Sequence, residues 1–119
     1  MLNRELEQLK ELLERLQSTK GTIFVVEGQK DVAALRALNI DADFFLLSRS
    51  KRSLYESAEV ISKRYNRAIL MLDQDQKGKE LTKRMVNYLQ RLGVHVNTKY
   101  ARTLLNITRS STIEGITLE

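Results

Sequence analysis

The sequence predicts an α/β protein, a three-layer sandwich in which helices cover both faces of a four-stranded, mainly parallel sheet. Two observations support this fold class. Short β-rich runs alternate with helical patterns along the chain, and those runs are continuously apolar, as is typical of parallel strands covered on both faces. The length of 119 residues fits a single domain. We therefore expect an α/β domain at residues 21–119, preceded by an added amphipathic helix within residues 1–20.

The amino-terminal helix is predicted by leucines that recur at steps of four, three, four and three residues: Leu2, Leu6, Leu9, Leu13 and Leu16. Two heptads fall short of the three or four that indicate a free coiled coil. We expect this helix to dock on its own domain, with dimerisation through it as the alternative.

The four strands are predicted at residues 22–26, 43–47, 68–72 and 94–97, with helices between them. Ser53 and Glu56 form a capping-box pattern at the start of the second of these helices. Gly93 is placed to end the third, and a short closing helix is expected at residues 100–107.

Composition restricts the compartment and the partners. The chain has no cysteine, which excludes disulfides and thiolate catalysis, and no run approaches the roughly 20 apolar residues of a membrane span. We expect a soluble cytoplasmic protein without a membrane partner. The net charge of +5 is localised, because residues 77–109 carry eight Lys or Arg against the single Glu80. Such a basic stretch attracts polyanions, so nucleic acid is the first candidate partner, and a solvated helix face is the alternative.

Acidic residues follow two of the predicted strands. Ligands of parallel α/β sheets bind beyond the carboxyl ends of the strands, where Glu27 follows the first strand and Asp73 and Asp75 follow the third. Carboxylate oxygens are the ligands that Mg²⁺ prefers, so the Asp-x-Asp pair predicts a magnesium site, against the alternative of a solvated loop. Glu27 is expected to complete that site or to move a proton, or else to cap the following helix. Gly78 is expected to let a phosphate approach the backbone N–H groups of the helix start.

Two motifs, FVVEGQKDVAALRAL and ILMLDQDQKGKEL, resemble the Toprim domain, a Rossmann-like domain shared by topoisomerases, bacterial-type primases, certain nucleases and small stand-alone proteins. The resemblance covers residues 22–98. It implies a catalytic role for Glu27 as general acid or base and Mg²⁺ binding by Asp73 and Asp75, with Gly28 and Gly78 as the motif glycines. The EGQKD form is most similar to the small stand-alone members and the ribosomal-RNA maturase branch.

One departure from the family pattern lies in the second motif. That motif often has a proline between the aspartates and a basic residue after them, whereas this chain has Gln74 and Gln76 there, and its base is displaced to Lys77. Contacts to nucleic-acid phosphates are expected from the cations near these motifs and after the second strand: Lys30, Arg49, Lys51, Arg52, Lys77 and Lys79. Helical spacing does not allow Lys77, Lys79, Lys83 and Arg84 to share one face, and Arg102 and Arg109 are candidates to extend a groove.

These expectations leave three functions open. The first is a Mg²⁺-dependent nucleic-acid-binding protein, with RNA favoured over DNA, that cleaves or processes phosphodiesters as a nuclease. The second is a non-catalytic RNA-binding subunit that works with protein partners in a larger RNA-processing assembly. The third, a receiver-like or phosphatase-like domain acting on small phosphates, does not explain the glutamate motif.

Overall fold

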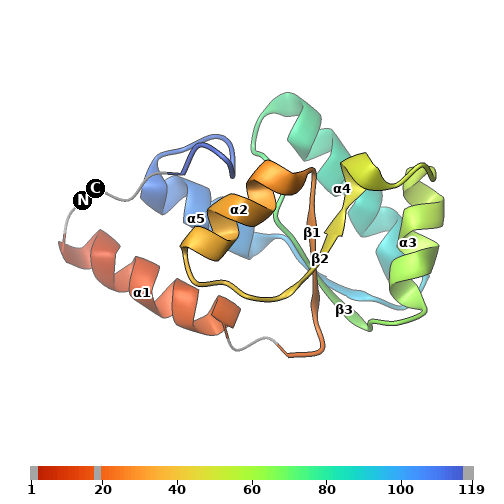
Figure 1. Cartoon of the computed structure of the whole chain (residues 1–119), viewed down its shortest axis with the longest axis horizontal. Coiled ribbons are helices and arrows are strands. Elements are labelled where there is room, and N and C mark those ends of the chain that lie inside the picture. The colour runs from red at the N-terminus through yellow and green to blue at the C-terminus, as the bar shows by residue number, and fades with distance from the viewer. Residues whose placement is uncertain (1–2, 18–19, 117–119) are drawn as a thin grey trace.

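The computed structural model describes residues 3–17 and 20–116 (Figure 1). Its elements are, in chain order, α1 (Asn3–Gln17), β1 (Ile23–Val26), α2 (Gln29–Ala37), β2 (Asp43–Leu46), the 3₁₀ helix η1 (Leu47–Arg49), α3 (Leu54–Ser62), β3 (Arg67–Leu70), α4 (Gln76–Arg91), β4 (His95–Asn97) and α5 (Lys99–Thr108). The predicted alternation of strands and helices is confirmed.

The sheet has the strand order β2-β1-β3-β4, and every neighbouring pair is parallel. Phe24 of β1 lies opposite Phe44 of β2 on one side and Ile69 of β3 on the other. The four residues of β1 are all buried, which is the physical reason for their uninterrupted apolar sequence. The carboxyl ends of all four strands therefore meet at one edge of the sheet.

Two apolar cores lie on opposite faces of this sheet. One core joins the sheet to α1, α2 and α5, and includes Leu12, Leu35 and Leu104. The other joins it to α3 and α4, and includes Ile61 and Leu89. The predicted three-layer sandwich is thus confirmed, with three helices on one face and two on the other.

The amino-terminal helix α1 belongs to the first of these cores. Leu9, Leu12 and Leu16 are buried there, whereas Leu6 is exposed on the same helix. Figure 1 shows α1 beside α5, and these two helices are in contact. A helix of this length is marginal alone in water, so its apolar stripe is stabilised by docking on the domain. Leu2 lies outside the described residues.

The helix boundaries follow their local sequence signals. Ser53 accepts a hydrogen bond from the Glu56 N–H at 3.1 Å, and the Glu56 carboxylate accepts one from the Ser53 N–H at 3.0 Å, which is the predicted capping box. Gly93 has a φ of 83°, the left-handed conformation that ends α4 at low steric cost. The second strand is one residue shorter than expected, because Leu47 starts η1 instead.

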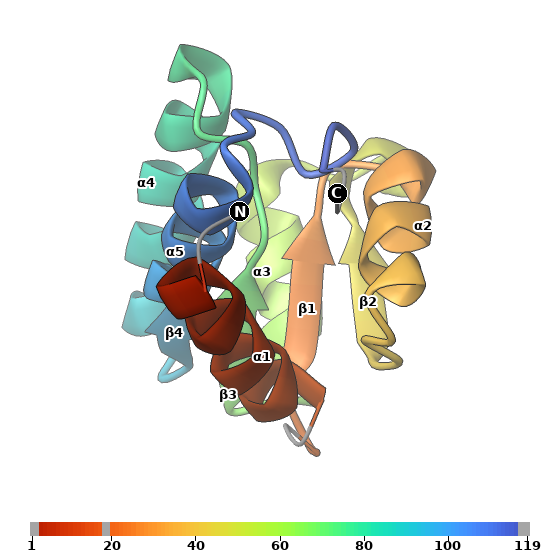
Figure 2. The same ribbon diagram turned by 90° about the vertical axis from the view of Figure 1, so that its left-hand side faces the viewer.

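A segment of irregular structure follows α5 and crosses the carboxyl edge of the sheet. We name residues 110–116 the strap. Figure 2 shows it in dark blue, passing from the α5 side toward α2 above the upper end of β1. Ile113 holds the strap in place, because its side chain is fully buried in the core shared by α1, α2 and α5. No helix within the described ranges has the length and apolar character to cross a membrane.

Candidate metal and nucleic-acid site

The acidic motifs lie where the strand order reverses. The chain passes from β1 to its neighbour β2 on one side, and then crosses to β3 on the other side of β1. The carboxyl ends of β1 and β3 therefore flank the switch point at which α/β sheets bind ligands. Glu27 follows β1 directly, and Asp73 comes three residues after the end of β3. The topology thus brings together two motifs that are 46 residues apart in the sequence.

Glu27 forms an ion pair with the base that is displaced in the second motif. The Lys77 Nζ donates a hydrogen bond to Glu27 Oε1 at 3.0 Å, and the carboxylate raises the pKa of the exposed lysine. Glu27 does not cap α2. Asp31 has that role, since its Oδ2 accepts a hydrogen bond from the Gly28 N–H at 3.0 Å. Helix capping is therefore not the role of Glu27. The Oε2 of Glu27 has no hydrogen-bond partner among the described residues.

Asp73 is held by the strap. Its Oδ1 accepts a hydrogen bond from the Ile113 N–H at 2.8 Å, and the neighbouring Gln74 N–H donates to the Ser111 carbonyl at 2.9 Å. These two bonds tie the strap to the loop between β3 and α4. They fix the orientation of the Asp73 carboxylate and leave its Oδ2 without a hydrogen-bond partner in the part of the chain that the structure describes.

Asp75 is the N-cap of α4. Its Oδ1 accepts a hydrogen bond from the Gly78 N–H at 2.7 Å, so that N–H is already used inside the protein. Of the backbone N–H groups at the start of α4, the Gly78 N–H is therefore already satisfied by Asp75, and the approach of a phosphate to the helix start stays a prediction. Gly78 is instead required by packing, because a Cβ at this position would overlap the Asp73 carbonyl oxygen.

Five carboxylates act on one another at this edge, and we name them the acidic cluster: Glu27, Asp31, Asp73, Asp75 and Glu114. Burial raises the pKa of Asp73, the Ile113 N–H partly offsets this, and the charges of three neighbouring carboxylates raise it further. Burial likewise raises the pKa of Asp31. The sequence did not assign Asp31 or Glu114 to this site, because Asp31 lies within the first turn of α2 and Glu114 lies on the strap, which was not predicted.

The donor chemistry of the acidic cluster fits a hard divalent cation. Among residues 3–17 and 20–116, no three His, Cys, Asp or Glu side chains are arranged to enclose a metal by themselves. Mg²⁺ does not need such a cage, since it typically binds one or two carboxylates and keeps several waters. The free Oδ2 of Asp73 is available to such an ion, and the charge of the ion would offset the burial and the carboxylate repulsion that raise the pKa of this group.

The other predicted cations divide into separate groups. The Ser48 N–H donates to the Glu27 carbonyl at 2.8 Å, which ties the turn after β2 to the carboxyl end of β1. The cations of that turn are exposed, and they are Arg49, Lys51 and Arg52. Lys30 is exposed in the first turn of α2. Lys77 points to Glu27, whereas Lys79 lines a hollow on the other side of the α4 start.

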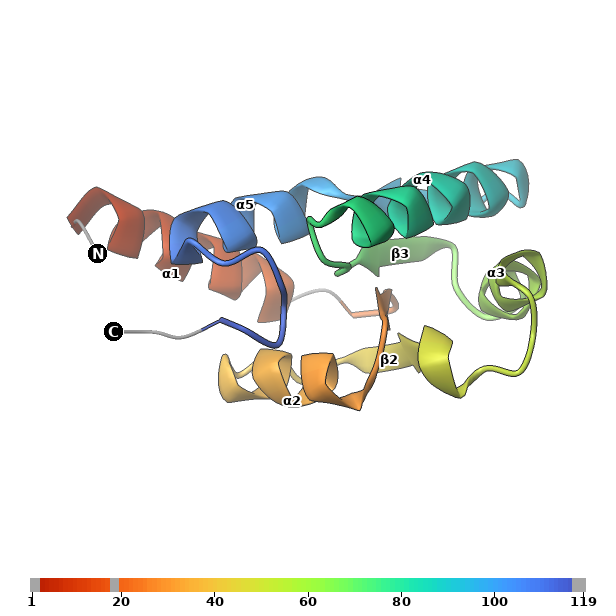
Figure 3. The ribbon, with the colours of Figure 1, turned by 90° about the horizontal axis from the view of Figure 1, so that it is seen from above.

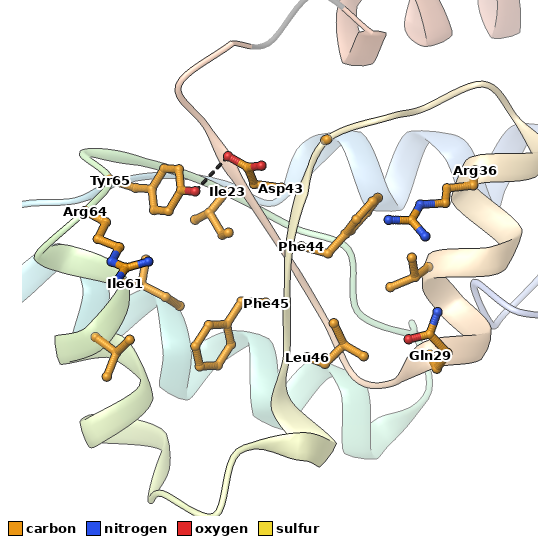
Figure 4. Close-up of a pocket in the computed structure, with 13 residues that line it drawn as sticks. Ile23, Gln29, Arg36, Asp43, Phe44, Phe45, Leu46, Ile61, Arg64 and Tyr65 are labelled. Carbon is orange, nitrogen blue, oxygen red and sulfur yellow. Dashed lines mark hydrogen bonds between the residues drawn. The ribbon is translucent and has the colours of Figure 1, made fainter.

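A second hollow lies away from the acidic cluster. It has a volume of about 540 Å³ along the outer edge of β2, and none of the five clustered carboxylates lines it. Figure 4 shows Phe44, Phe45 and Tyr65 on this edge. The Tyr65 hydroxyl donates to Asp43 at 2.7 Å, and the Arg36 guanidinium lies 5.6 Å from the centre of the Phe44 ring. These contacts tie β2 to α2 and to the segment that follows α3.

Comparison with known proteins agrees with this geometry. The Toprim domain model matches residues 22–104, which include all four strands and both motifs. Toprim domains are in general Mg²⁺-binding domains with metal-dependent functions on nucleic acids.

Similar curated proteins come from archaea. A UPF0292 protein of Thermococcus gammatolerans is 37% identical over 106 residues, which cover 89% of this chain and 76% of that protein. A UPF0292 protein of Pyrococcus abyssi is 35% identical, with coverage of 88% and 76%. A solved structure, a putative protein from Aquifex aeolicus, shares the fold with a TM-score of 0.75 at 24% identity, over 91% of this chain and 97% of that one. The chain is a member of the Toprim domain family, related to small archaeal UPF0292 proteins.

Proposed function

We propose that this protein binds nucleic acid, RNA in preference to DNA, and cleaves or processes phosphodiesters with Mg²⁺ at the acidic cluster. The observation that carries the proposal is the meeting of Glu27 and Asp73 at the switch point of the sheet, within a family whose domains bind Mg²⁺. The local excess of positive charge in residues 77–109 supports a polyanionic partner. In this proposal the reaction takes place in the cytoplasm.

In this proposal each acidic residue has a separate task. Asp73 and Asp75 hold Mg²⁺, which supplies positive charge to the phosphodiester oxygens when bound. The strap N–H of Ile113 orients Asp73, and the Gly78 N–H orients Asp75. Glu27 takes up or releases a proton at Oε2, while Lys77 holds the other oxygen at 3.0 Å.

A specific observation favours a second candidate, a non-catalytic RNA-binding subunit of a processing assembly. Asp73 and Glu27 each give one carboxylate oxygen to a partner within the same chain, the strap N–H and Lys77 respectively. A protein that only needs its acids neutralised and its loops fixed would use these same contacts. Its Mg²⁺ would then be structural, and protein partners would supply the chemistry.

Nuclease assays with purified protein separate the two candidates. End-labelled structured RNA and duplex DNA are incubated with Mg²⁺, Mn²⁺ or EDTA, for the wild type and for the variants Glu27→Gln and Asp73→Asn. Asp41→Asn is the matched control, because Asp41 is exposed just before β2, at the opposite edge of the sheet. We expect metal-dependent cleavage of RNA that both site variants lose and the control retains.

Other outcomes of these assays would support the second candidate or contradict both. Binding without cleavage under every metal condition would favour the non-catalytic subunit. An affinity that does not change with salt concentration would contradict phosphate binding altogether, since cationic contacts to nucleic acid release counterions.

A further inference from the structure

A cationic hollow lies between α4 and α5, next to the loop that carries the acidic cluster. Its volume is about 560 Å³, and its lining is Gln74, Lys79, Thr82, Lys83, Val86, Thr98, Arg102 and Asn106. Three of these side chains are cations and none is a carboxylate. We name Lys79, Lys83 and Arg102 the groove cations, and the hollow the basic groove.

The spacing of these residues explains how two helices build one groove. Lys79 and Lys83 are four residues apart, so they lie on one face of α4. Thr98, just before α5, and Arg102 and Asn106 in α5 follow one another at the same spacing. α4 packs on one face of the sheet and α5 on the other, so the groove lies where the two helix layers meet beyond β4. Figure 3 shows both helices on the side of the molecule opposite to α2 and β2.

The groove cations have no ion-pair partner in the part of the chain that the structure describes. Glu27 pairs with Lys77 and Glu5 with Arg109, and no ion pair among the described residues involves Lys79, Lys83 or Arg102. All three are exposed. Their charges are therefore available to an anion from outside, and the hydroxyl and amide groups of the lining add hydrogen-bonding capacity beside them.

The basic groove borders the loop that carries Asp73 and Asp75. Gln74, which lines the groove, lies between Asp73 and Asp75 in the sequence, and its backbone N–H is bonded to the strap. We propose that the basic groove binds the sugar-phosphate backbone of a nucleic-acid strand, at phosphates that neighbour the one reaching the acidic cluster. The inference rests on the proposed function and deepens it by naming the surface that positions the substrate.

The dimensions favour a strand over a single phosphate. Lys79 and Lys83 are separated by about 6 Å along the axis of α4, given a rise of 1.5 Å per residue. One strand of duplex nucleic acid presents a phosphate about every 3.4 Å along its axis. The lysine pair thus spans successive nucleotides, and Arg102 approaches the same strand from α5.

The test measures binding by fluorescence anisotropy in EDTA, so that metal-dependent cleavage does not interfere. The probes are a labelled hairpin RNA and a labelled duplex DNA, titrated between about 50 and 200 mM salt. The groove variant is the double substitution Lys83→Ala with Arg102→Ala. The matched control is Lys63→Ala with Arg91→Ala, which also removes two exposed cations, from helix ends that precede β3 and β4 at the opposite edge of the sheet.

We expect the groove variant to bind RNA about tenfold more weakly than the wild type. On duplex DNA, the slope of log K against log salt should fall by about 1.8, since each lost phosphate contact removes about 0.9. The control should stay within about twofold of the wild type, and circular dichroism should show that both variants are folded.

The results that overturn the inference differ from those that overturn the proposed function. If the wild type binds and the groove variant keeps its affinity and salt slope, the groove is not the binding surface, but the nucleic-acid function stands. An equal loss in the control would show that only total charge matters, and would also refute the groove. If the wild type binds neither probe, in EDTA or with Mg²⁺, both proposals fail.

Discussion

Substitution of Gly78 by alanine tests whether packing, rather than ligand binding, requires the glycine of the second motif. An alanine Cβ would overlap the Asp73 carbonyl oxygen and lie 2.7 Å from the carbonyl carbon, where about 3.5 Å is the optimal separation. The obstacle is backbone, which has no alternative rotamer. The Asp73 peptide must therefore move by on the order of 1 Å away from α4.

The expected cost follows from the contacts that this movement disturbs. Overpacking costs typically 1–3 kcal/mol, and the loss of the Asp75 cap adds about 1 kcal/mol. The better helix propensity of alanine returns up to about 1 kcal/mol. We expect Gly78→Ala to lower the free energy of unfolding by about 1–3 kcal/mol.

The other motif glycine provides the control. Gly28 has a φ of −154°, which any residue adopts, and an added Cβ would meet only the exposed Ser48 hydroxyl at 3.3 Å. Gly28→Ala should therefore change stability by no more than about 0.5 kcal/mol. Both variants are measured by urea unfolding followed by circular dichroism. A loss below about 1 kcal/mol in Gly78→Ala would refute the packing argument.

Three further predictions concern the site. Lys77→Met should leave stability within about 0.5 kcal/mol of the wild type, because the ion pair of Lys77 with Glu27 is exposed. The affinity for Mg²⁺, measured by calorimetry, should rise because the lysine no longer competes with the ion, and an unchanged affinity would contradict this. Burial raises the pKa of Asp31, so the folded protein keeps the proton of this carboxyl to a higher pH than the unfolded chain does. The stability that the protonated carboxyl contributes is therefore lost as pH rises through the raised pKa. Asp31→Asn keeps an acceptor for the Gly28 N–H and should lessen that loss in urea unfolding measured from about pH 4 to pH 7; an unaltered pH profile would contradict it. Ile113→Ala should cost about 2–4 kcal/mol in the same unfolding assay, because the side chain is fully buried, and a loss under about 1 kcal/mol would show that the strap is not anchored there.

The fold was predictable because its signals are local and consistent. The capping box of α3, the left-handed Gly93 and the apolar run of β1 each specify their structure within a few residues. The parallel sheet then places Glu27 and Asp73 at one edge without further information. For these features, periodicity and turn chemistry are sufficient to predict the structure.

The contacts within the site were not predictable in the same way, because they join segments far apart in the chain. The bond from Ile113 to Asp73 spans 40 residues, and the ion pair between Lys77 and Glu27 spans 50. Periodicity carries no information about such distances. The strap itself has the polar composition of an ordinary loop, and its fixed position becomes evident only in the folded structure, from the burial of Ile113 and the hydrogen bonds to Asp73 and Gln74.

Arg102 was a candidate to extend a groove, but its position beside the cations of α4 was not predictable, for a related reason. Helical spacing indicates which lysines of α4 share a face, but it does not indicate which other helix lies opposite. Arg102 faces Lys83 across the groove only because the two helices come from opposite faces of the sheet and meet beyond β4.

The strap also sets an order of events during synthesis. Residues 110–116 are translated after every strand and after both acidic motifs, yet they provide the N–H that orients Asp73. Until these residues have been made and have docked, Asp73 lacks that hydrogen bond. The acidic cluster is therefore completed by a segment that follows every strand in the chain.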